Sequence, residues 1–216
     1  EELMEKYFAG EEFSTEEIQN ALRENVKQCN IAPILMGSGI HVQGFNVLLQ
    51  VIDKYFPSPK ELEAIGVDAS TGEHFTAHYN DEATISGRVW KTIADPFLGK
   101  YSLFKICTGV LKANSEVYNV NKEATEKIGK LYILRGNTPI EVPELKSGDL
   151  GAVAKLSITE TGDSIAVRNA PIIYHAPKLS VPYTYMAYSA ENKADEDKLS
   201  TALQRMMEED RTLKVK

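Results

Sequence analysis

The sequence has few of the features that mark secreted, disulfide-bonded or membrane-spanning proteins. Its 216 residues include only two cysteines, Cys29 and Cys107, whose separation indicates neither a disulfide framework nor a zinc site. The longest apolar runs, such as Ile31–Met36, are far shorter than the roughly 20 residues that cross a bilayer. The chain starts with Glu-Glu-Leu-Met-Glu, where a secretory signal would be basic. We therefore expect a cytoplasmic location and no membrane partner.

An excess of positive charge is also lacking. The formal net charge is −7, which argues against attraction of the whole chain to nucleic acid. Residues 84–176 are the exception, with 12 basic and 9 acidic side chains, whereas residues 1–30 carry 3 and 8. Residues 31–83 carry 2 and 7, and residues 177–216 carry 7 of each. Any contact with an RNA backbone is therefore expected in residues 84–176.

The parts that bind nucleotide phosphates are missing. The chain has no Gly-x-x-x-x-Gly-Lys-Ser/Thr loop and no Asp-x-x-Gly switch sequence, and these hold the phosphates and Mg²⁺ in GTPases. Asn192–Asp195 matches the guanine-specificity pattern Asn-Lys-x-Asp, but it stands at the start of a predicted helix, where capping explains it. We therefore expect no catalytic residues and no cofactor in this chain.

Two histidines, His74 and His78, have the four-residue spacing that can bind a metal on a helix. Their surroundings have the composition of a linker, and no third ligand is near in the sequence. This favours solvated loop histidines, and we expect no metal site.

Residues 1–57 are expected to form two helices, a short strand and a third helix. Ser14 followed by Glu17 predicts a capping box at the start of one helix. Asn30–Met36 is predicted as an apolar strand, and Gly44–Phe56 as an amphipathic helix. Because one strand cannot make a parallel sheet, this α/β segment is expected to be the end of a domain.

The composition of the chain changes at residue 60 and again at residue 84. Residues 60–83 have the composition of a linker. From residue 84 to residue 176, short β-prone runs alternate with glycine-containing turns, which predicts a closed antiparallel β-barrel. The predicted strands are Ile85–Ala94, Tyr101–Thr108, Glu116–Val120, Lys127–Leu134, Gly151–Leu156 and Ile172–His175.

Residues 177–216 are predicted to begin another α/β domain. The pattern indicates a strand over Leu179–Ala187, a helix over Asp195–Met207 and a strand over Thr212–Val215. The fold class is therefore mixed and predominantly β, with α/β segments on both sides of the barrel.

Motifs in this order resemble those of the elongation factor G family of translational GTPases, across essentially the whole chain. The motifs are Tyr55-Phe56-Pro57-Ser58-Pro59, Asp95-Pro96-Phe97-x-Gly99-Lys100, Gly109-Val-Leu-Lys112, Gly148-Asp149, Thr161-Gly162-Asp163 and Lys193-Ala194-Asp195. The resemblance implies the end of a GTPase domain in residues 1–59, a barrel domain II in 84–176 and the start of a ferredoxin-like domain III in 177–216. It also implies that the full-length protein uses GTP and Mg²⁺ to drive ribosomal translocation.

The resemblance implies two sets of site residues. A Gly-Ser-Ala motif that helps to recognise guanine corresponds to Gly37, Ser38 and Gly39, with glycine where the family usually has alanine. The barrel loops that face the RNA of the small ribosomal subunit correspond to Pro96, Phe97, Gly99, Lys100, Lys112 and Asn114. Lysine contacts to phosphates would position the protein without reading sequence.

Several alternatives remain open at this point. Arg135–Thr138 and Ser147–Val153 are closer to elongation factor G-like paralogues than to the main translocase. Tetracycline-protection proteins and the release-factor GTPase share the architecture. An autonomous module, whose barrel binds RNA or protein without any nucleotide, is a candidate from another class. We expect the chain to be a monomer and to bind guanine nucleotide only as part of the full-length protein.

Overall fold

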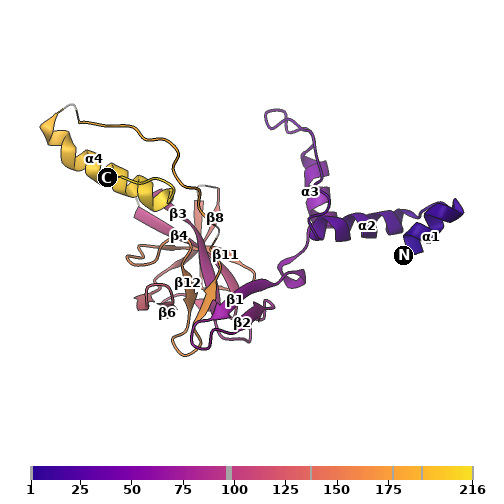
Figure 1. The fold of residues 1–216 in the computed structure, drawn as a ribbon, viewed down its shortest axis with the longest axis horizontal. Coiled ribbons are helices and arrows are strands. Elements are labelled where there is room, and N and C mark those ends of the chain that lie inside the picture. Colours follow the sequence, from indigo (N-terminus) through magenta and orange to yellow (C-terminus); the bar gives the residue numbers. More distant parts are fainter. Residues whose placement is uncertain (1, 96–98, 137, 177, 191, 216) are drawn as a thin grey trace. The chain divides into compact units, whose positions relative to one another are not determined.

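The computed structural model of this protein describes residues 2–95, 99–136, 138–176, 178–190 and 192–215 (Figure 1). The chain forms two compact units, Glu1–Leu62 and Glu63–Lys216. Within the described ranges, no helix is both long and apolar enough to cross a membrane.

The first unit is helical. It contains the helices α1 (Glu2–Ala9), α2 (Thr15–Lys27) and α3 (Phe45–Tyr55) and the short 3-10 helix η1 (Pro59–Glu61). The predicted capping box is confirmed: the Glu17 amide donates to Ser14 Oγ over 3.2 Å, and the Ser14 amide donates to the Glu17 carboxylate over 2.8 Å. These bonds satisfy two amides that the first turn of α2 leaves without helical partners.

The predicted strand over Asn30–Met36 is wrong. This segment is irregular, and the nearest β contact is an isolated bridge between Ser38 and Gln43. A strand is stabilised by hydrogen bonds to a neighbouring strand, and no described residue of the first unit supplies one to this segment.

The second unit consists mainly of antiparallel sheets, as predicted. Its largest sheet has the strand order β7-β6-β12-β3-β4-β11-β8-β9. These strands are β3 (Ser86–Asp95), β4 (Gly99–Thr108), β6 (Glu116–Asn119), β7 (Ala124–Lys127), β8 (Leu131–Arg135), β9 (Thr138–Val142), β11 (Leu150–Ala154) and β12 (Ser164–Ala166). Two small sheets complete the unit: β5 (Leu111–Lys112) pairs with β10 (Glu144–Leu145), and β1 (Ala64–Asp68) lies between β2 (His74–Ala77) and β13 (Ile172–Tyr174).

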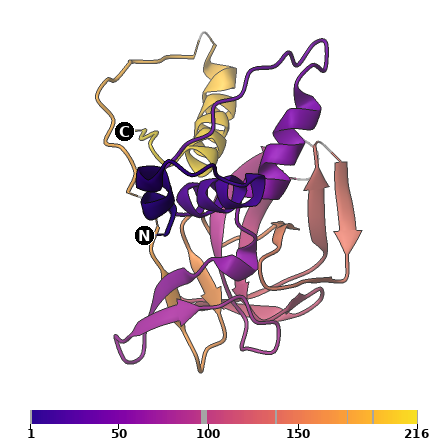
Figure 2. The same cartoon turned by 90° about the vertical axis from the view of Figure 1, so that its right-hand side faces the viewer.

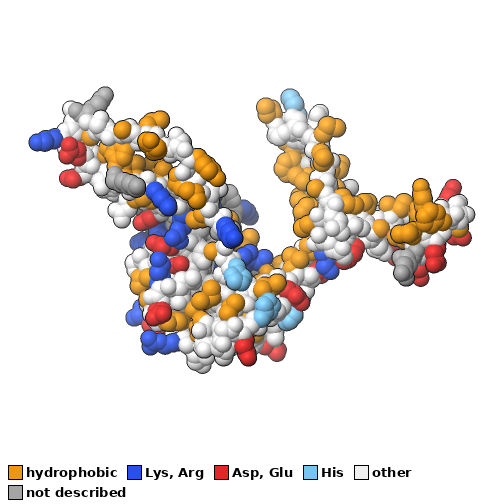
Figure 3. All heavy atoms as spheres, in the orientation of Figure 1, with side chains coloured by type: hydrophobic (Ala, Val, Ile, Leu, Met, Phe, Trp, Pro, Cys, Tyr) orange, Lys and Arg blue, Asp and Glu red, His pale blue; other side chains and the backbone are white. Residues whose placement is uncertain are grey.

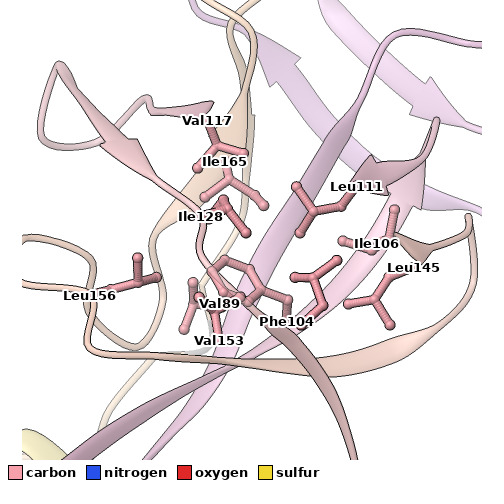
Figure 4. Packing of buried hydrophobic residues seen from close by; sticks show 11 residues of the cluster. Val89, Phe104, Ile106, Leu111, Val117, Ile128, Leu145, Val153, Leu156 and Ile165 are labelled. Atoms are coloured by element: carbon pink, nitrogen blue, oxygen red, sulfur yellow. The ribbon is translucent and has the colours of Figure 1, made fainter. Parts of the chain in front are cut away.

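The large sheet wraps around one hydrophobic core. Figure 4 shows Phe104 and Ile106 of β4 pointing towards Val89, Val153 and other apolar residues from the surrounding strands. Both residues of β4 are fully buried. Side chains alternate along a strand, so Tyr101 and Leu103 lie on the opposite face of the sheet. There they form a second buried cluster with Ala152 of β11.

Residues 60–83, which the sequence predicts as a linker, contain the hairpin of β1 and β2. The small sheet, which also contains β13, is joined to the large one by a hydroxyl contact: Ser86 Oγ of β3 lies 2.6 Å from the Tyr174 hydroxyl of β13. The linker prediction failed here because β1 pairs with β13, which lies about a hundred residues further along the chain. Local composition does not reveal such a distant partner. The boundaries expected for the three domains stay a prediction.

The predicted helix in the last segment is confirmed. It consists of η2 (Lys193–Asp195) and α4 (Glu196–Glu209), and α4 lies beside β3 in both views (Figures 1 and 2). The Ala94 amide donates to Glu209 Oε1, and Arg211 Nη1 donates to the Thr161 carbonyl, each over 2.5 Å. The predicted strands over Leu179–Ala187 and Thr212–Val215 are not formed, because neither pairs with another described segment.

Candidate nucleic-acid interface

The barrel surface carries a hollow of about 630 Å³ with three lysines in its lining. We call it the lysine hollow. Four separated stretches of sequence meet there: Asn114–Glu116, Lys127–Lys130, Tyr132 and Ala154–Lys155. In Figure 3, Lys and Arg side chains are more numerous over the strands of the second unit than over the helices of the first. The hollow therefore lies in the one segment whose charge is positive.

Backbone hydrogen bonds hold one side of the hollow. The Asn114 amide donates to the Gly129 carbonyl over 2.9 Å, and the Ile128 amide donates to the Ser115 carbonyl over 2.8 Å. Ile128 is also anchored by its side chain, which is 1% exposed and belongs to the core. The turn between β7 and β8 is thus fixed against the turn that contains Asn114, which places Lys127 and Lys130 at the hollow.

Lys155 reaches the hollow from the end of β11. Its backbone has a φ of +66°, a left-handed conformation that is uncommon for a lysine. Its amide donates to the Lys100 carbonyl over 2.9 Å, so the residue is attached to β4 while its side chain lines the hollow.

A buried carboxylate fixes the loop that follows Lys155. Glu126 is 7% exposed, and it accepts hydrogen bonds from the amides of Ser157, Ile158 and Thr159 over 2.8, 2.8 and 2.9 Å. The hydroxyls of Ser157 and Thr159 also donate to it. Burial alone would raise the pKa of Glu126, but these hydrogen bonds outweigh it and hold that pKa below its ordinary value. The ionised carboxylate therefore joins β7 to the loop beside the hollow.

The three lysines differ in their ionic partners. Lys130 Nζ lies 2.7 Å from Glu141 Oε2, and this hydrogen-bonded contact raises the pKa of Lys130. Within the described parts of the chain, no ion pair forms at Lys127 or Lys155. These two ammonium groups are therefore the ones that an anionic ligand could pair with.

Comparison with known proteins identifies the barrel and the segment after it. Residues 84–168 match the family model described as elongation factor G domain 2, and residues 179–216 match the one described as Elongation Factor G, domain III. The chain belongs to the elongation factor G family. A crystal structure of a protein from Thermus thermophilus is similar to this chain, with a TM-score of 0.72 and 26% sequence identity. The match covers 100% of this chain and 30% of that one, so the present chain spans less than a third of that protein.

The loop residues expected from the elongation factor G resemblance fall into different surroundings. Asn114 lines the lysine hollow. Lys112 is exposed in β5, opposite Glu144 of β10, and does not belong to the hollow's lining. Pro96 and Phe97 lie outside the described residues. Gly99 opens β4 with a φ of +84°, a value that favours glycine because a side chain would be strained there.

Lys100 is not among the residues that line the lysine hollow. It is half-buried and lines a smaller hollow of about 220 Å³ with Thr92 and Glu160 of the barrel and with residues of the α4 region, among them Met207 and Arg211. Only its carbonyl approaches the lysine hollow, through the bond to Lys155. Lys100 and Lys112 therefore do not line the lysine hollow, and their contact with ribosomal RNA stays a prediction.

Of the residues that line this surface, only Asn114 was expected from the sequence; the three lysines and the tyrosine, Lys127, Lys130, Lys155 and Tyr132, were not. The positive charge of residues 84–176 was the available signal. It could not single these residues out, because the hollow depends on which turns of the barrel lie side by side.

The motif Gly37-Ser38-Gly39 begins a closed loop. Ser38 and Gln43 exchange two backbone hydrogen bonds of 3.0 and 3.1 Å, and the His41 amide donates to Ser38 Oγ over 3.2 Å. A Cβ atom at Gly37 would lie 2.7 Å from the Gln43 carbonyl oxygen, so the loop itself requires glycine there. Recognition of guanine by these residues stays a prediction.

No metal site is found in the described ranges, where no three His, Cys, Asp or Glu side chains gather. His74 lies in β2, not on a helix, and His78 Nδ1 is 3.4 Å from Glu63 Oε1. The four-residue spacing of the two histidines therefore does not bring them onto one helical turn.

Proposed function

We propose that this chain is part of a translational GTPase that acts in ribosomal translocation, and that its barrel binds the RNA of the small ribosomal subunit. Membership of the elongation factor G family supports the first part. The observation that supports the second part is the lysine hollow, where Lys127 and Lys155 offer two cations that form no ion pair with the described residues. Lysines bind phosphates as point charges and need no particular base sequence, which suits a docking role.

In this proposal the chain itself does not perform the hydrolysis. It contains no phosphate-binding loop and no switch sequence, so GTP and Mg²⁺ would be bound by other parts of the full-length protein in the cytoplasm. The barrel would hold the protein on the ribosome while the α4 segment transmits the nucleotide state. GTP turnover by the purified chain, abolished by Ser38→Ala, would contradict this division of roles.

Co-sedimentation with small ribosomal subunits tests the docking. We expect Lys127→Glu with Lys155→Glu to weaken the binding and to reduce its dependence on salt, because two phosphate contacts are lost. Lys146→Glu is the matched control, since Lys146 is exposed in the barrel but lies outside the hollow. Unchanged binding by the double variant would rule out the hollow as the docking surface.

The two loop lysines provide a second comparison. If the start of β4 and the strand β5 also touch RNA, Lys100→Glu and Lys112→Glu should each lower the affinity for the small ribosomal subunit. If only the hollow touches RNA, these variants should behave like Lys146→Glu. The comparison therefore distinguishes RNA binding by Lys100 and Lys112, which the motifs indicate, from RNA binding by the lysine hollow.

A further inference from the structure

One side chain in the lysine hollow is not explained by simple phosphate docking. Tyr132 is the second residue of β8, and it lies opposite Ala152 of β11 and Glu141 of β9. Its ring packs edge-on against Tyr101, with ring centroids 5.8 Å apart and an interplanar angle of 90°. Because Tyr101 is only 5% exposed, it gives the Tyr132 ring a fixed support on one side.

The lining of the hollow around Tyr132 includes both small and charged residues. Ala154 of β11 lines the hollow beside it, and Ala152 is fully buried next to it. Alanine leaves room for a flat group to lie against the ring. Lys127, Lys130 and Lys155 line the same hollow together with one acidic residue, Glu116, which lies opposite Lys127 in the pairing of β6 with β7, so the lining keeps an excess of positive charge. The volume of about 630 Å³ falls within the range of about 300–1,000 Å³ that is usual for sites of small ligands.

We propose that the lysine hollow binds one unpaired RNA nucleotide. The base stacks on Tyr132, and the phosphates on either side of that nucleotide contact Lys127 and Lys155. Asn114 and Ser115, which line the hollow, can donate hydrogen bonds to the edge of the base. This inference rests on the proposed function, because it specifies which kind of RNA the barrel contacts.

The aromatic ring favours an unpaired nucleotide over a duplex. In an RNA helix the bases are stacked on one another and their faces are inaccessible, so a protein ring can stack only on a base that is single-stranded or bulged. A duplex would need the lysines but not Tyr132. Lys130 is already paired with Glu141, so its charge is partly neutralised and the two phosphate partners are Lys127 and Lys155.

Fluorescence anisotropy with two labelled probes tests the inference: a short single-stranded oligoadenylate, and a mixed-sequence RNA duplex of the same length. We expect the chain to bind the single strand more tightly. Tyr132→Leu keeps an apolar side chain against Tyr101 but removes the ring, and it should weaken single-strand binding about 5- to 150-fold. Tyr132→Phe keeps the ring and should bind like the unchanged chain.

The controls separate stacking from charge and from folding. Tyr118→Leu removes a half-buried tyrosine of β6 outside the hollow and should leave binding unchanged. Lys127→Ala and Lys155→Ala should each reduce the slope of log K against log salt concentration by about 0.7, whereas Tyr132→Leu should not change that slope. Equal melting temperatures of Tyr132→Leu and Tyr132→Phe would show that the ring acts on binding and not on the fold.

Each other outcome overturns the inference in a recognisable way. If the duplex binds as tightly as the single strand and Tyr132→Leu has no effect, the hollow docks phosphates only, and the proposed function stands without this inference. If poly-glutamate competes as well as RNA does, the occupant is an acidic protein. If neither RNA binds and the hollow variants also leave ribosome binding unchanged, both the inference and the docking proposal fail.

Discussion

Glu126 shows how one side chain organises the barrel surface. Its carboxylate accepts three amides and two hydroxyls of the loop Ser157–Thr159. No local sequence pattern marks this residue, because its partners are more than thirty positions away. The network also explains why a loop that follows a strained Lys155 keeps a defined shape.

Replacing this carboxylate should destabilise the barrel. A glutamine at this position can accept fewer hydrogen bonds from the loop amides. Its own NH2 group would face the donors of Thr159 and could not accept from them. We expect Glu126→Gln to lower the free energy of unfolding by about 2 kcal/mol, the usual cost of leaving a buried donor unsatisfied. Urea denaturation measures this loss. Glu123→Gln is the control, because Glu123 is exposed; an equal loss in both variants would contradict the role of the network.

The contribution of Glu126 should depend on pH. Its pKa is lowered in the folded protein, so the folded state prefers the ionised carboxylate more than the unfolded state does. The stabilisation is therefore complete above the ordinary carboxyl pKa of about 4.3, and it is lost as the pH falls through the lower folded-state value. We expect the stability difference between the unchanged chain and Glu126→Gln to shrink in acid. A difference that stays constant from neutral to acid pH would refute this.

Gly109 lies at a position where the backbone conformation and the lack of space both require glycine. It has a φ of +69°, and a Cβ atom there would lie 2.6 Å from the Ala83 carbonyl oxygen. Gly72 has a similar φ of +76° but no atom within 4 Å of a Cβ position. Both alanine variants carry the strain of a left-handed backbone, of about 1 kcal/mol, but only Gly109→Ala also clashes. We expect Gly109→Ala to lower the melting temperature clearly more than Gly72→Ala does.

At the scale of elements, the α4 region is attached to the barrel by few polar contacts. Arg211 donates to the Thr161 carbonyl and lies 3.6 Å from Glu160, and Glu209 accepts from the Ala94 amide. We expect Arg211→Ala to speed hydrogen exchange in α4 without changing exchange in β4. Arg205→Ala, an exposed change on the same helix, is the control. Equal exchange in both variants would mean that Arg211 does not hold α4.

The strands of the second unit differ in how well the sequence predicts them. β3, β4, β6, β11 and β13 were predicted within about two residues, because each has β-prone residues between clear turns. The predicted strand over Lys127–Leu134 spans the end of β7, a turn and most of β8, and the hairpin of β1 and β2 and the strands β5, β9, β10 and β12 were missed. The missed strands have only two to five residues each, too few for a clear pattern of their own, and they are stabilised mainly by the strands they pair with. For the same reason two apolar segments, Asn30–Met36 and Leu179–Ala187, were predicted as strands although they have no partner in the described structure.

At the scale of the whole molecule, the two units differ in how they are stabilised. Every buried hydrophobic residue of the described chain lies in Glu63–Lys216. In the first unit, none of the helices buries a residue, and apolar side chains such as Phe45 and Ile52 remain 49% and 46% exposed. Isolated helices of this length are marginally stable in water.

We therefore expect residues 63–216 to fold without the first unit. Produced alone, they should unfold in a cooperative transition at nearly the melting temperature of the whole chain, because the core is unchanged. Residues 1–62 alone should show only a gradual loss of helix on heating. Circular dichroism distinguishes the two results. A large drop in the melting temperature of residues 63–216 would show that the helical unit contributes to the stability of the barrel unit.

The sequence by itself determined the family, the antiparallel β character of residues 84–176 and the position of the positive charge. These depend on local spacing, turns and composition, which neighbouring residues encode directly. Only the tertiary structure decided where the basic surface lies. The lysine hollow joins four stretches between Asn114 and Lys155, and Lys100 turns out to face α4 instead. Strand order and register set these neighbours, and both arise from long-range pairing that no short stretch of sequence specifies.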